Sequence, residues 1–176
     1  MKKINKMNEA ELSAFVQAHL EKEGIDVVLS GGSVVTIYSN NKYVSKDLDL
    51  VNRYAINHKK IRSVMIKLGF QEQGRYFTHL DTELFIEFPA GPLAIGEEVI
   101  SDIVEREVET GTLRIISPTD CVKDRLAAYY HWNDHQCLVQ AEYVAQSQNV
   151  DLEEVEKWSE REGMLAKFEE IRSRLK

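Results

Sequence analysis

Two aspartates follow a glycine-rich turn in the first third of the chain. Residues 27–51 read VVLSGGSVVTIYSNNKYVSKDLDLV, so that an apolar run ends in Gly-Gly-Ser and, after a polar loop, Asp47 and Asp49 alternate with leucines. Because side chains alternate along a strand, these two aspartates point to the same face, with their Cα atoms roughly 6–7 Å apart. Repulsion between neighbouring carboxylates is relieved by a proton or by a metal ion. The spacing therefore predicts a site for a hard divalent cation.

The turn before the aspartates, Gly31-Gly32-Ser33, has the composition of a phosphate-binding segment. Glycine lets the backbone approach a ligand closely, and backbone amides at the start of a helix attract anions. The hydroxyl group of Ser33 could donate a hydrogen bond to a phosphate oxygen, or it could cap the short helix expected over residues 33–38, and the two roles are compatible. Together with the aspartates, the turn indicates a site for a metal ion and a phosphate.

A third carboxylate is expected from the strand predicted over residues 83–88. Glu83, Phe85 and Glu87 share one face of this strand, and Glu87 is the first choice because it ends the strand beside a Pro-Ala-Gly-Pro loop, with Glu83 as the alternative. Three carboxylates could hold two Mg²⁺ (or Mn²⁺) ions that orient a triphosphate and stabilise the leaving pyrophosphate. The third acid could also act as a general base. The plain alternative is that these are solvated strand residues beside an ordinary turn.

Alternating and helical patterns predict an α/β (α+β) protein, a mixed sheet flanked by helices with a C-terminal helical bundle. We expect an α/β core over residues 1–116 and a helical region over residues 117–176, which pack as one unit. Helices are predicted over residues 8–24, 33–38, 56–68, 117–130, 134–146, 151–162 and 164–175, and strands over residues 25–29, 47–51, 75–80, 83–88, 103–108 and 113–116.

Composition narrows the class of protein. The chain has 176 residues, 43% of them hydrophobic, and a formal net charge of −7. The negative charge argues against a broad DNA-binding surface, which needs many lysine and arginine contacts to phosphate, but it allows a single nucleotide bound through a metal ion. The sequence has no membrane-span or signal-peptide pattern. We therefore expect a cytoplasmic protein in which Cys121 and Cys137 are reduced.

A strand, Gly31-Gly32-Ser33, and a strand with Asp47-Leu48-Asp49 together resemble the nucleotidyltransferase superfamily that includes DNA polymerase β. The resemblance implies a nucleotidyltransferase-like mixed sheet, an NTP substrate, and metal binding by Asp47, Asp49 and a later acid, here Glu87. The sequence departs from the usual pattern in two places, since the loop before Asp47 is long and the third acid is Glu where Asp is commoner.

The helical half carries a second resemblance. The segment SPTDCVKDRLAA, which begins at Ser117, followed by Asp134, is similar to bacterial minimal nucleotidyltransferases that include the AbiEii-type toxins. This similarity implies that Arg125 (or Lys123) contacts the nucleotide, that Asp134 orients the site, and that a cognate partner protein exists. From the residues alone, Lys123 and Arg125 are equally well explained as a surface pair that flanks Asp124.

Two functions remain open at this point. The first is Mg²⁺-dependent transfer of a nucleoside monophosphate from an NTP to a hydroxyl group of a protein, an RNA or a small molecule. The second is a non-catalytic nucleotide-binding or toxin–antitoxin regulatory module. A zinc site at His131 and His135 is a weaker alternative, because two histidines at this spacing lack the glutamate of a His-Glu-x-x-His motif.

Overall fold

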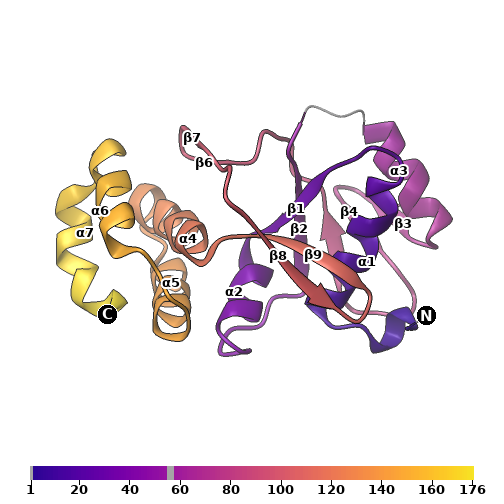
Figure 1. Cartoon of the computed structure of the whole chain (residues 1–176), viewed down its shortest axis with the longest axis horizontal. Helices are drawn as coiled ribbons and strands as arrows, with labels where there is room; N and C mark the ends of the chain where they lie inside the picture. The colour runs from indigo at the N-terminus through magenta and orange to yellow at the C-terminus, as the bar shows by residue number, and fades with distance from the viewer. Residues whose placement is uncertain (1, 55–57) are drawn as a thin grey trace.

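Seven strands form one mixed sheet in the order β3-β4-β5-β2-β1-β9-β8 in the computed structural model, which describes residues 2–54 and 58–176 (Figure 1). The strands of this sheet are β1 (Val27–Ser30), β2 (Asp47–Asn52), β3 (Gln71–Gln73), β4 (Tyr76–Thr78), β5 (Phe85–Glu87), β8 (Ile103–Val108) and β9 (Gly111–Ile116), and a separate hairpin contains β6 (Ala94–Ile95) and β7 (Glu98–Val99). The helices are α1 (Glu9–Glu21), α2 (Gly32–Tyr38), α3 (His58–Lys67), α4 (Pro118–Trp132), α5 (His135–Ser147), α6 (Leu152–Arg161) and α7 (Leu165–Ile171), with short 3-10 turns at Ile4–Lys6 and Arg172–Leu175. The predicted mixed sheet with flanking helices and a C-terminal helical region is confirmed.

The helices form two groups at opposite ends of the molecule. Figure 1 shows α1 and α3 at one end of the molecule and α4 to α7 gathered at the other, with α2 between them. The chain changes from strands to helices between Ile116, the last residue of β9, and Pro118, the first residue of α4. Within the described ranges, no helix is both long and apolar enough to cross a membrane.

Side chains with oxygen acceptors begin the helices where the sequence predicts. Asn8 and Glu11 form both hydrogen bonds of a capping box at the start of α1. Ser117 accepts a hydrogen bond from the amide of Asp120, with Pro118 in the first turn of α4. Asp134 accepts from two amides at the start of α5. These local signals explain why the helix starts agree with the sequence patterns.

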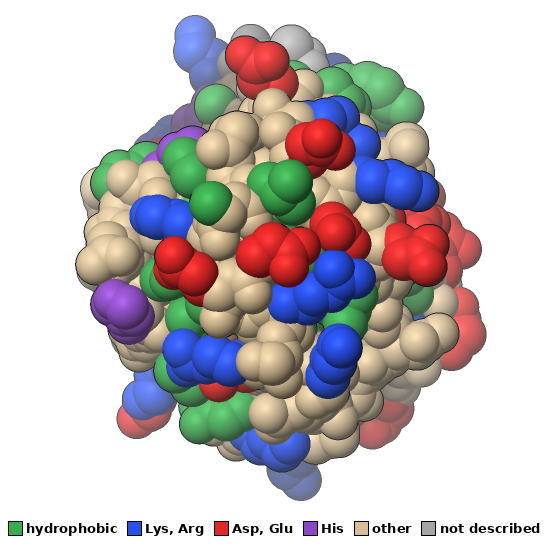
Figure 2. Space-filling model, turned by 90° about the vertical axis from the view of Figure 1, so that its left-hand side faces the viewer, with side chains coloured by type: hydrophobic (Ala, Val, Ile, Leu, Met, Phe, Trp, Pro, Cys, Tyr) green, Lys and Arg blue, Asp and Glu red, His purple; other side chains and the backbone are tan. Residues whose placement is uncertain are grey.

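The outer face of the C-terminal helices carries charges of both signs. Figure 2 shows lysine, arginine, aspartate and glutamate side chains interleaved over this face. Arg172 pairs with Glu156, and Arg161 pairs with Glu154. Alternating charge of this kind is typical of a solvated helix surface.

Several element bounds differ from the sequence patterns. β4 and β5 are three residues each, shorter than the predicted strands, because only the part that pairs with a neighbour is regular. β3 was not predicted, since Gln71–Gln73 is polar and two of its residues are exposed at the sheet edge. The β6–β7 hairpin, with two residues in each strand, also lacks a recognisable pattern. The predicted final helix divides into α7 and a 3-10 turn, and residues 56 and 57 of the predicted helix over 56–68 lie outside the described residues.

The buried side chain of Gln17 joins β1 to β9, two parallel strands in which Leu29 lies opposite Ile115. Its amide nitrogen donates to the carbonyl oxygens of Val27 (3.2 Å) and Arg114 (2.7 Å), and its oxygen accepts from the amide of Arg114 (2.9 Å). The side chain thus satisfies three backbone groups between the strands.

Replacing Gln17 with Ala should lower the free energy of unfolding by about 3 kcal/mol, because it leaves three buried backbone groups without partners and opens a cavity. Urea denaturation measures this change. Gln136→Ala, at an exposed position of α5, should change stability by less than about 0.5 kcal/mol. An equal effect of the two substitutions would show that Gln17 does not bridge the strands.

Candidate active site

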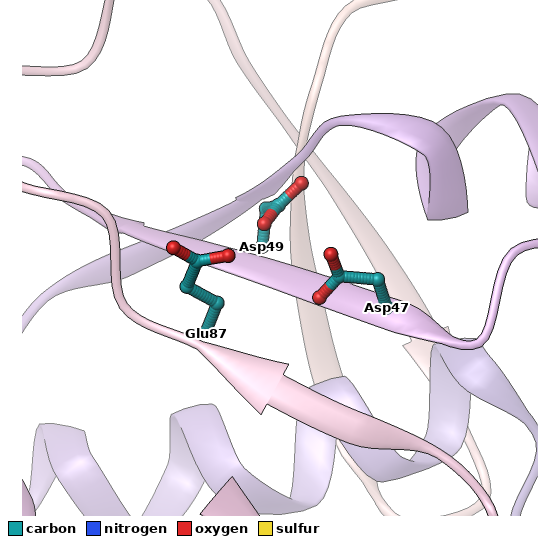
Figure 3. A group of neighbouring side chains, drawn as sticks. All are labelled: Asp47, Asp49 and Glu87. Atoms are coloured by element: carbon teal, nitrogen blue, oxygen red, sulfur yellow. The ribbon is translucent and has the colours of Figure 1, made fainter. Parts of the chain in front are cut away.

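Three carboxylates meet on one face of the sheet. Asp47 and Asp49 lie on the central strand β2, and Glu87 lies at the end of β5, which runs parallel to β2 with Glu87 directly opposite Asp49. One carboxylate oxygen from each residue lies within 4.8 Å of the others (Figure 3). We call these three residues the carboxylate triad. Leu48 and Leu50, which alternate with the aspartates, are completely buried on the opposite face. One face of β2 therefore contributes leucines to the core, and the other face contributes aspartates to the site.

The electrostatics of the triad favour a positively charged ligand. Burial and the neighbouring carboxylates of Asp47 and Glu87 raise the pKa of Asp49 to about 7, against a smaller opposing effect of Arg125. Burial and Glu87 also raise the pKa of Asp47, and the charge of Arg75 partly opposes this increase. The Oδ1 atom of Asp47 is buried and has no hydrogen-bond partner. A proton or a cation would relieve this arrangement.

The residues of the triad fit a divalent metal ion. All three are half-buried carboxylates, which are the ligands that Mg²⁺ and Mn²⁺ prefer. The unpartnered Oδ1 atom of Asp47 supplies a lone pair that no protein group uses. Among the described residues, no other group of three acidic, histidine or cysteine side chains gathers as closely.

Position 31 requires a glycine because the backbone there lies against the side chain of Asp49. Its backbone has φ 73° and ψ −156°, a conformation that is essentially restricted to glycine. A Cβ atom at this position would lie 2.1 Å from Oδ2 of Asp49, which is far inside van der Waals contact. Since Ser30 of β1 lies opposite Asp49 in the sheet register, the turn directly follows the strand beside the triad. The missing side chain therefore makes room for the Asp49 carboxylate.

The rest of the turn is also packed against the β2 strand. The hydroxyl group of Ser33 is buried and donates to the backbone carbonyl of Asp47. A Cβ atom at Gly32 would lie 3.2 Å from Oγ of Ser45. Ser33 therefore ties α2 to the start of β2 and does not cap the helix, since the N-cap of α2 is Gly31 and makes no side-chain cap hydrogen bond.

Arg125 is held near the triad by its neighbours on α4 and α5. Its guanidinium group donates to Asp124 through Nε (3.2 Å) and Nη2 (2.6 Å), and to Gln140 through Nη1 (3.2 Å). Its positive charge acts on Asp49, as the pKa of that residue shows. Asp134 caps α5, and its Oδ2 atom accepts from the Cys137 thiol, whose sulfur lies 3.9 Å from Nη1 of Arg125. The guanidinium is thus fixed in place, and its effect on the pKa of Asp49 is partly offset by its own partner Asp124.

The contacts of Lys123 are with a different set of acids. Its side chain is 3% exposed, and its Nζ atom lies 2.8 Å from Glu98, 3.0 Å from Glu154 and 3.7 Å from Asp120. These contacts connect α4 to α6 and to the β6–β7 hairpin. Of the two basic residues proposed from sequence, Arg125 is the one that lowers the pKa of Asp49.

Arg75 is a site residue that the sequence patterns do not indicate. Its Nε atom lies 3.6 Å from Oε1 of Glu87, and its charge acts on Asp47. The strands expected over residues 75–80 and 83–88 pair as β4 and β5, and this pairing brings Arg75, the residue before β4, close to the triad. Glu83, the alternative third acid, is 83% exposed at its side chain and pairs with Lys46 outside the triad.

The two histidines considered for zinc have other neighbours. Nε2 of His131 lies 3.6 Å from Glu162, and the His135 ring packs edge-on against Tyr129 at 5.5 Å between centroids. Asn133, in a left-handed conformation, ends α4 between them. The pair is therefore divided by a helix junction, so the two side chains do not project from consecutive turns of one helix.

A mixed sheet that carries a carboxylate triad on adjacent parallel strands, with flanking helices and a C-terminal helical region, is a nucleotidyltransferase-like fold. No protein-family model matches the chain, and no curated protein matches it significantly. The class therefore rests on the structure.

Solved structures share this fold at low sequence identity. An antigenic nucleotidyltransferase-like protein from Paracoccidioides brasiliensis matches with a TM-score of 0.58 and 14% identity over 95% of this chain and 91% of that one. The antibiotic-resistance factor ANT(2'')-Ia matches in its solution structure, with a TM-score of 0.51 and 14% identity over 92% and 91% of the two chains. It also matches in its complex with adenylyl-2''-tobramycin, with a TM-score of 0.51 and 15% identity over 92% and 95%. At these identities the likeness shows the fold alone.

The raised pKa of Asp49 predicts how the stability of the metal-free protein depends on pH. Its pKa is about 7 in the folded protein and near 3.8 when the chain is unfolded. Between about pH 4 and pH 7 the folded state keeps a proton that the unfolded state has released. The stabilising contribution of this proton to the free energy of unfolding is therefore complete below about pH 4 and is lost as the pH rises through 7. We expect the free energy of unfolding to fall by about 2 kcal/mol more in the wild type than in Asp49→Asn between pH 5 and pH 8. Urea denaturation in a chelating buffer measures the difference, and parallel pH profiles would contradict it.

Proposed function

We propose that the protein transfers a nucleoside monophosphate from an NTP to a hydroxyl group of an acceptor, in a reaction that requires Mg²⁺ or Mn²⁺. The observation that carries the proposal is the gathering of Asp47, Asp49 and Glu87, of which Asp47 has an unpartnered buried oxygen. The group lies beside Gly31, where a side chain would clash with Asp49. The nucleotidyltransferase-like fold supports the same reaction class.

Each residue has a role that follows from its position. Asp47, Asp49 and Glu87 would hold the metal, which neutralises phosphate charge and lowers the pKa of the attacking hydroxyl group. The Gly31 to Ser33 turn would receive the triphosphate beside Asp49, and the fixed charge of Arg125 would stabilise negative charge that develops during transfer. Asp134, which contacts Cys137 next to Arg125, would help to orient that side chain.

The reaction forms one bond and breaks one. The acceptor oxygen attacks the α-phosphorus atom of the NTP and forms a new phosphoester bond, while the bond from that phosphorus to the β-phosphate bridge breaks and releases pyrophosphate. Glu87, at the end of β5, is placed to accept the hydroxyl proton as a general base. The products are the nucleotidylated acceptor, pyrophosphate and a proton.

Incubation with α-labelled NTPs, Mg²⁺ or Mn²⁺ and candidate hydroxyl acceptors tests the proposal. The wild type should label an acceptor and release pyrophosphate, and Asp47→Ala should not. Equal labelling by the two proteins, or the absence of metal-dependent NTP binding by the wild type in calorimetry, would reject the proposal.

Metal-dependent NTP binding without transfer would instead favour a regulatory module. The similarity of the segment that follows Ser117 to minimal nucleotidyltransferases supports such a module in the cytoplasm with a cognate partner protein, as in toxin–antitoxin pairs. Purification of the protein from its native host with and without NTP would then show whether a partner binds in a nucleotide-dependent way.

A further inference from the structure

We propose that Arg75, Tyr76 and Phe85 form a shelf beside Glu87 that binds the acceptor, and that this shelf selects an acceptor with an aromatic ring and a nearby anionic group. The inference rests on the proposed function and specifies its acceptor. We call these three residues the acceptor shelf: Arg75 directly precedes β4, Tyr76 is on β4 and Phe85 is on β5.

The sheet register places the aromatic side chains on the same face as the triad. Tyr76 lies directly opposite Glu87 in the antiparallel pair of β4 and β5, and Phe85 lies opposite Asp47 in the parallel pair of β5 and β2. Residues that lie opposite each other on adjacent strands share a face. The rings of Tyr76 and Phe85 contact each other edge to face with centroids 4.9 Å apart, and both residues are partly exposed. The triad is therefore continued outward by an aromatic surface.

Arg75 adds a positive charge to this surface. Its guanidinium carbon lies 4.8 Å from the centroid of the Tyr76 ring, and Nη2 donates to the Tyr76 hydroxyl group. The Arg75 side chain remains 68% exposed, and its distance of 3.6 Å from Glu87 is too long for a hydrogen bond. An exposed ion pair of this length contributes little to stability. The guanidinium is thus positioned by the ring and accessible to a ligand from solvent.

The location of the shelf suits the acceptor better than the NTP. The glycine turn contacts Asp49 on the β1 side of the triad, and this is where we place the triphosphate. Glu87 is the proposed base, so the reacting hydroxyl group must lie within hydrogen-bond distance of it. The body of the acceptor then extends from Glu87 over β5 and β4, which is the position of the shelf.

The chemistry of the shelf defines the class of acceptor. Exposed aromatic rings stack with planar rings, and an arginine beside them binds a phosphate or carboxylate by paired hydrogen bonds. The same positive charge repels a polycation. A hydroxyl compound that has both a planar ring and an anionic group, such as a nucleoside monophosphate, combines the features that the three residues recognise.

Calorimetry on protein saturated with Mg²⁺ and a non-hydrolysable ATP analogue tests the inference. Adenosine 5′-monophosphate carries ring and anion, adenosine carries only the ring, and ribose 5-phosphate carries only the anion. We expect the monophosphate to bind most tightly of the three compounds. Arg75→Gln should raise the Kd of the monophosphate about tenfold, which corresponds to about 1.4 kcal/mol, so that the monophosphate no longer binds more tightly than adenosine. Tyr76→Leu should weaken the two ring-containing compounds and leave ribose 5-phosphate nearly unchanged.

Matched substitutions control for general effects of charge and shape. Arg62 is an exposed arginine that pairs with Glu72, and Tyr54 is an exposed tyrosine next to the Arg53 guanidinium. Arg62→Gln and Tyr54→Leu should bind the monophosphate as the wild type does.

The outcomes separate this inference from the function on which it rests. Metal-dependent NTP binding by the wild type, combined with monophosphate binding that Arg75→Gln and Tyr76→Leu leave unchanged, would reject the shelf alone. The shelf would also be rejected if the monophosphate failed to bind to the loaded protein, or if tobramycin, a polycation without an aromatic ring, bound more tightly than the monophosphate. Absence of metal-dependent NTP binding would reject the proposed function, and the shelf with it.

Discussion

Replacing Asp49 with Asn should lower nucleotide transfer at least about a thousandfold, or about 4 kcal/mol in activation free energy, and at the same time stabilise the metal-free protein. The transfer rate falls because an amide is a poor ligand for Mg²⁺ and Asp49 is the central member of the carboxylate triad. Stability increases because the substitution removes a half-buried charge that Asp47 and Glu87 repel. We expect a gain of about 1–2 kcal/mol at pH 8, where the wild-type carboxylate is ionised.

Three measurements check the two halves of this prediction. Mn²⁺ titration and labelled-NTP transfer report on the site, and urea denaturation without metal reports on stability. Glu83→Gln is the matched control, since it removes an exposed acid near the same sheet edge whose partner is Lys46, and it should change transfer by less than about twofold. A variant at Asp49 that lost stability while retaining metal binding would contradict the role of the triad.

Replacing Gly31 with Ala should disrupt the metal site through a single methyl group. The added Cβ atom would lie 2.1 Å from Oδ2 of Asp49, so either the carboxylate or the turn has to move. Displacement of one ligand by even 1 Å disrupts metal geometry, and we expect metal affinity to fall by about 100-fold or more. The left-handed backbone adds a destabilisation of about 1–3 kcal/mol.

Gly24 provides a control in which a glycine with positive φ is replaced and no clash arises. It has φ +75°, close to the +73° of Gly31, but a Cβ atom there would meet nothing within 4 Å. Gly24→Ala should therefore lower stability by about 1–2 kcal/mol and leave Mn²⁺ affinity unchanged. If the two variants had the same affinity for Mn²⁺, the proximity of Gly31 to Asp49 would have no functional meaning.

Without a bound cation, the carboxylate triad opposes folding. The raised pKa values of Asp47 and Asp49 show that their charged forms are disfavoured in the metal-free protein. Binding of a divalent cation recovers this free energy, so metal affinity and stability are linked. Natural proteins often accept such a local cost where a binding site requires it.

The helix starts and the pair Asp47 and Asp49 are examples of what local sequence predicts. Asn8, Ser117 and Asp134 cap their own helices through amides two or three residues away, so the information is contained within one turn. Likewise, the alternation of Asp47 and Asp49 with leucines places two carboxylates on one face of any strand that this segment forms.

Pairings between distant segments required the tertiary structure. β3 is polar, and β6 and β7 have only two residues each, so none of these strands leaves a periodic pattern in the sequence. The parallel pairing of β2 with β5 brings Glu87 opposite Asp49, which precedes it by 38 residues (49 to 87). The partners of Lys123 on α6 and on the β6–β7 hairpin are likewise distant in the chain.

The sequence by itself determined the aspartate pair, the glycine turn and the order of most helices and strands, because each depends on residues within a few positions of one another. The tertiary structure decided which acid completes the triad, which cation acts on it, and why Gly31 must lack a side chain, since that glycine contacts a carboxylate eighteen residues away (31 to 49). The physical reason is that a strand's own alternation sets the direction of its side chains, whereas its neighbours in a sheet are chosen by the packing of the whole chain.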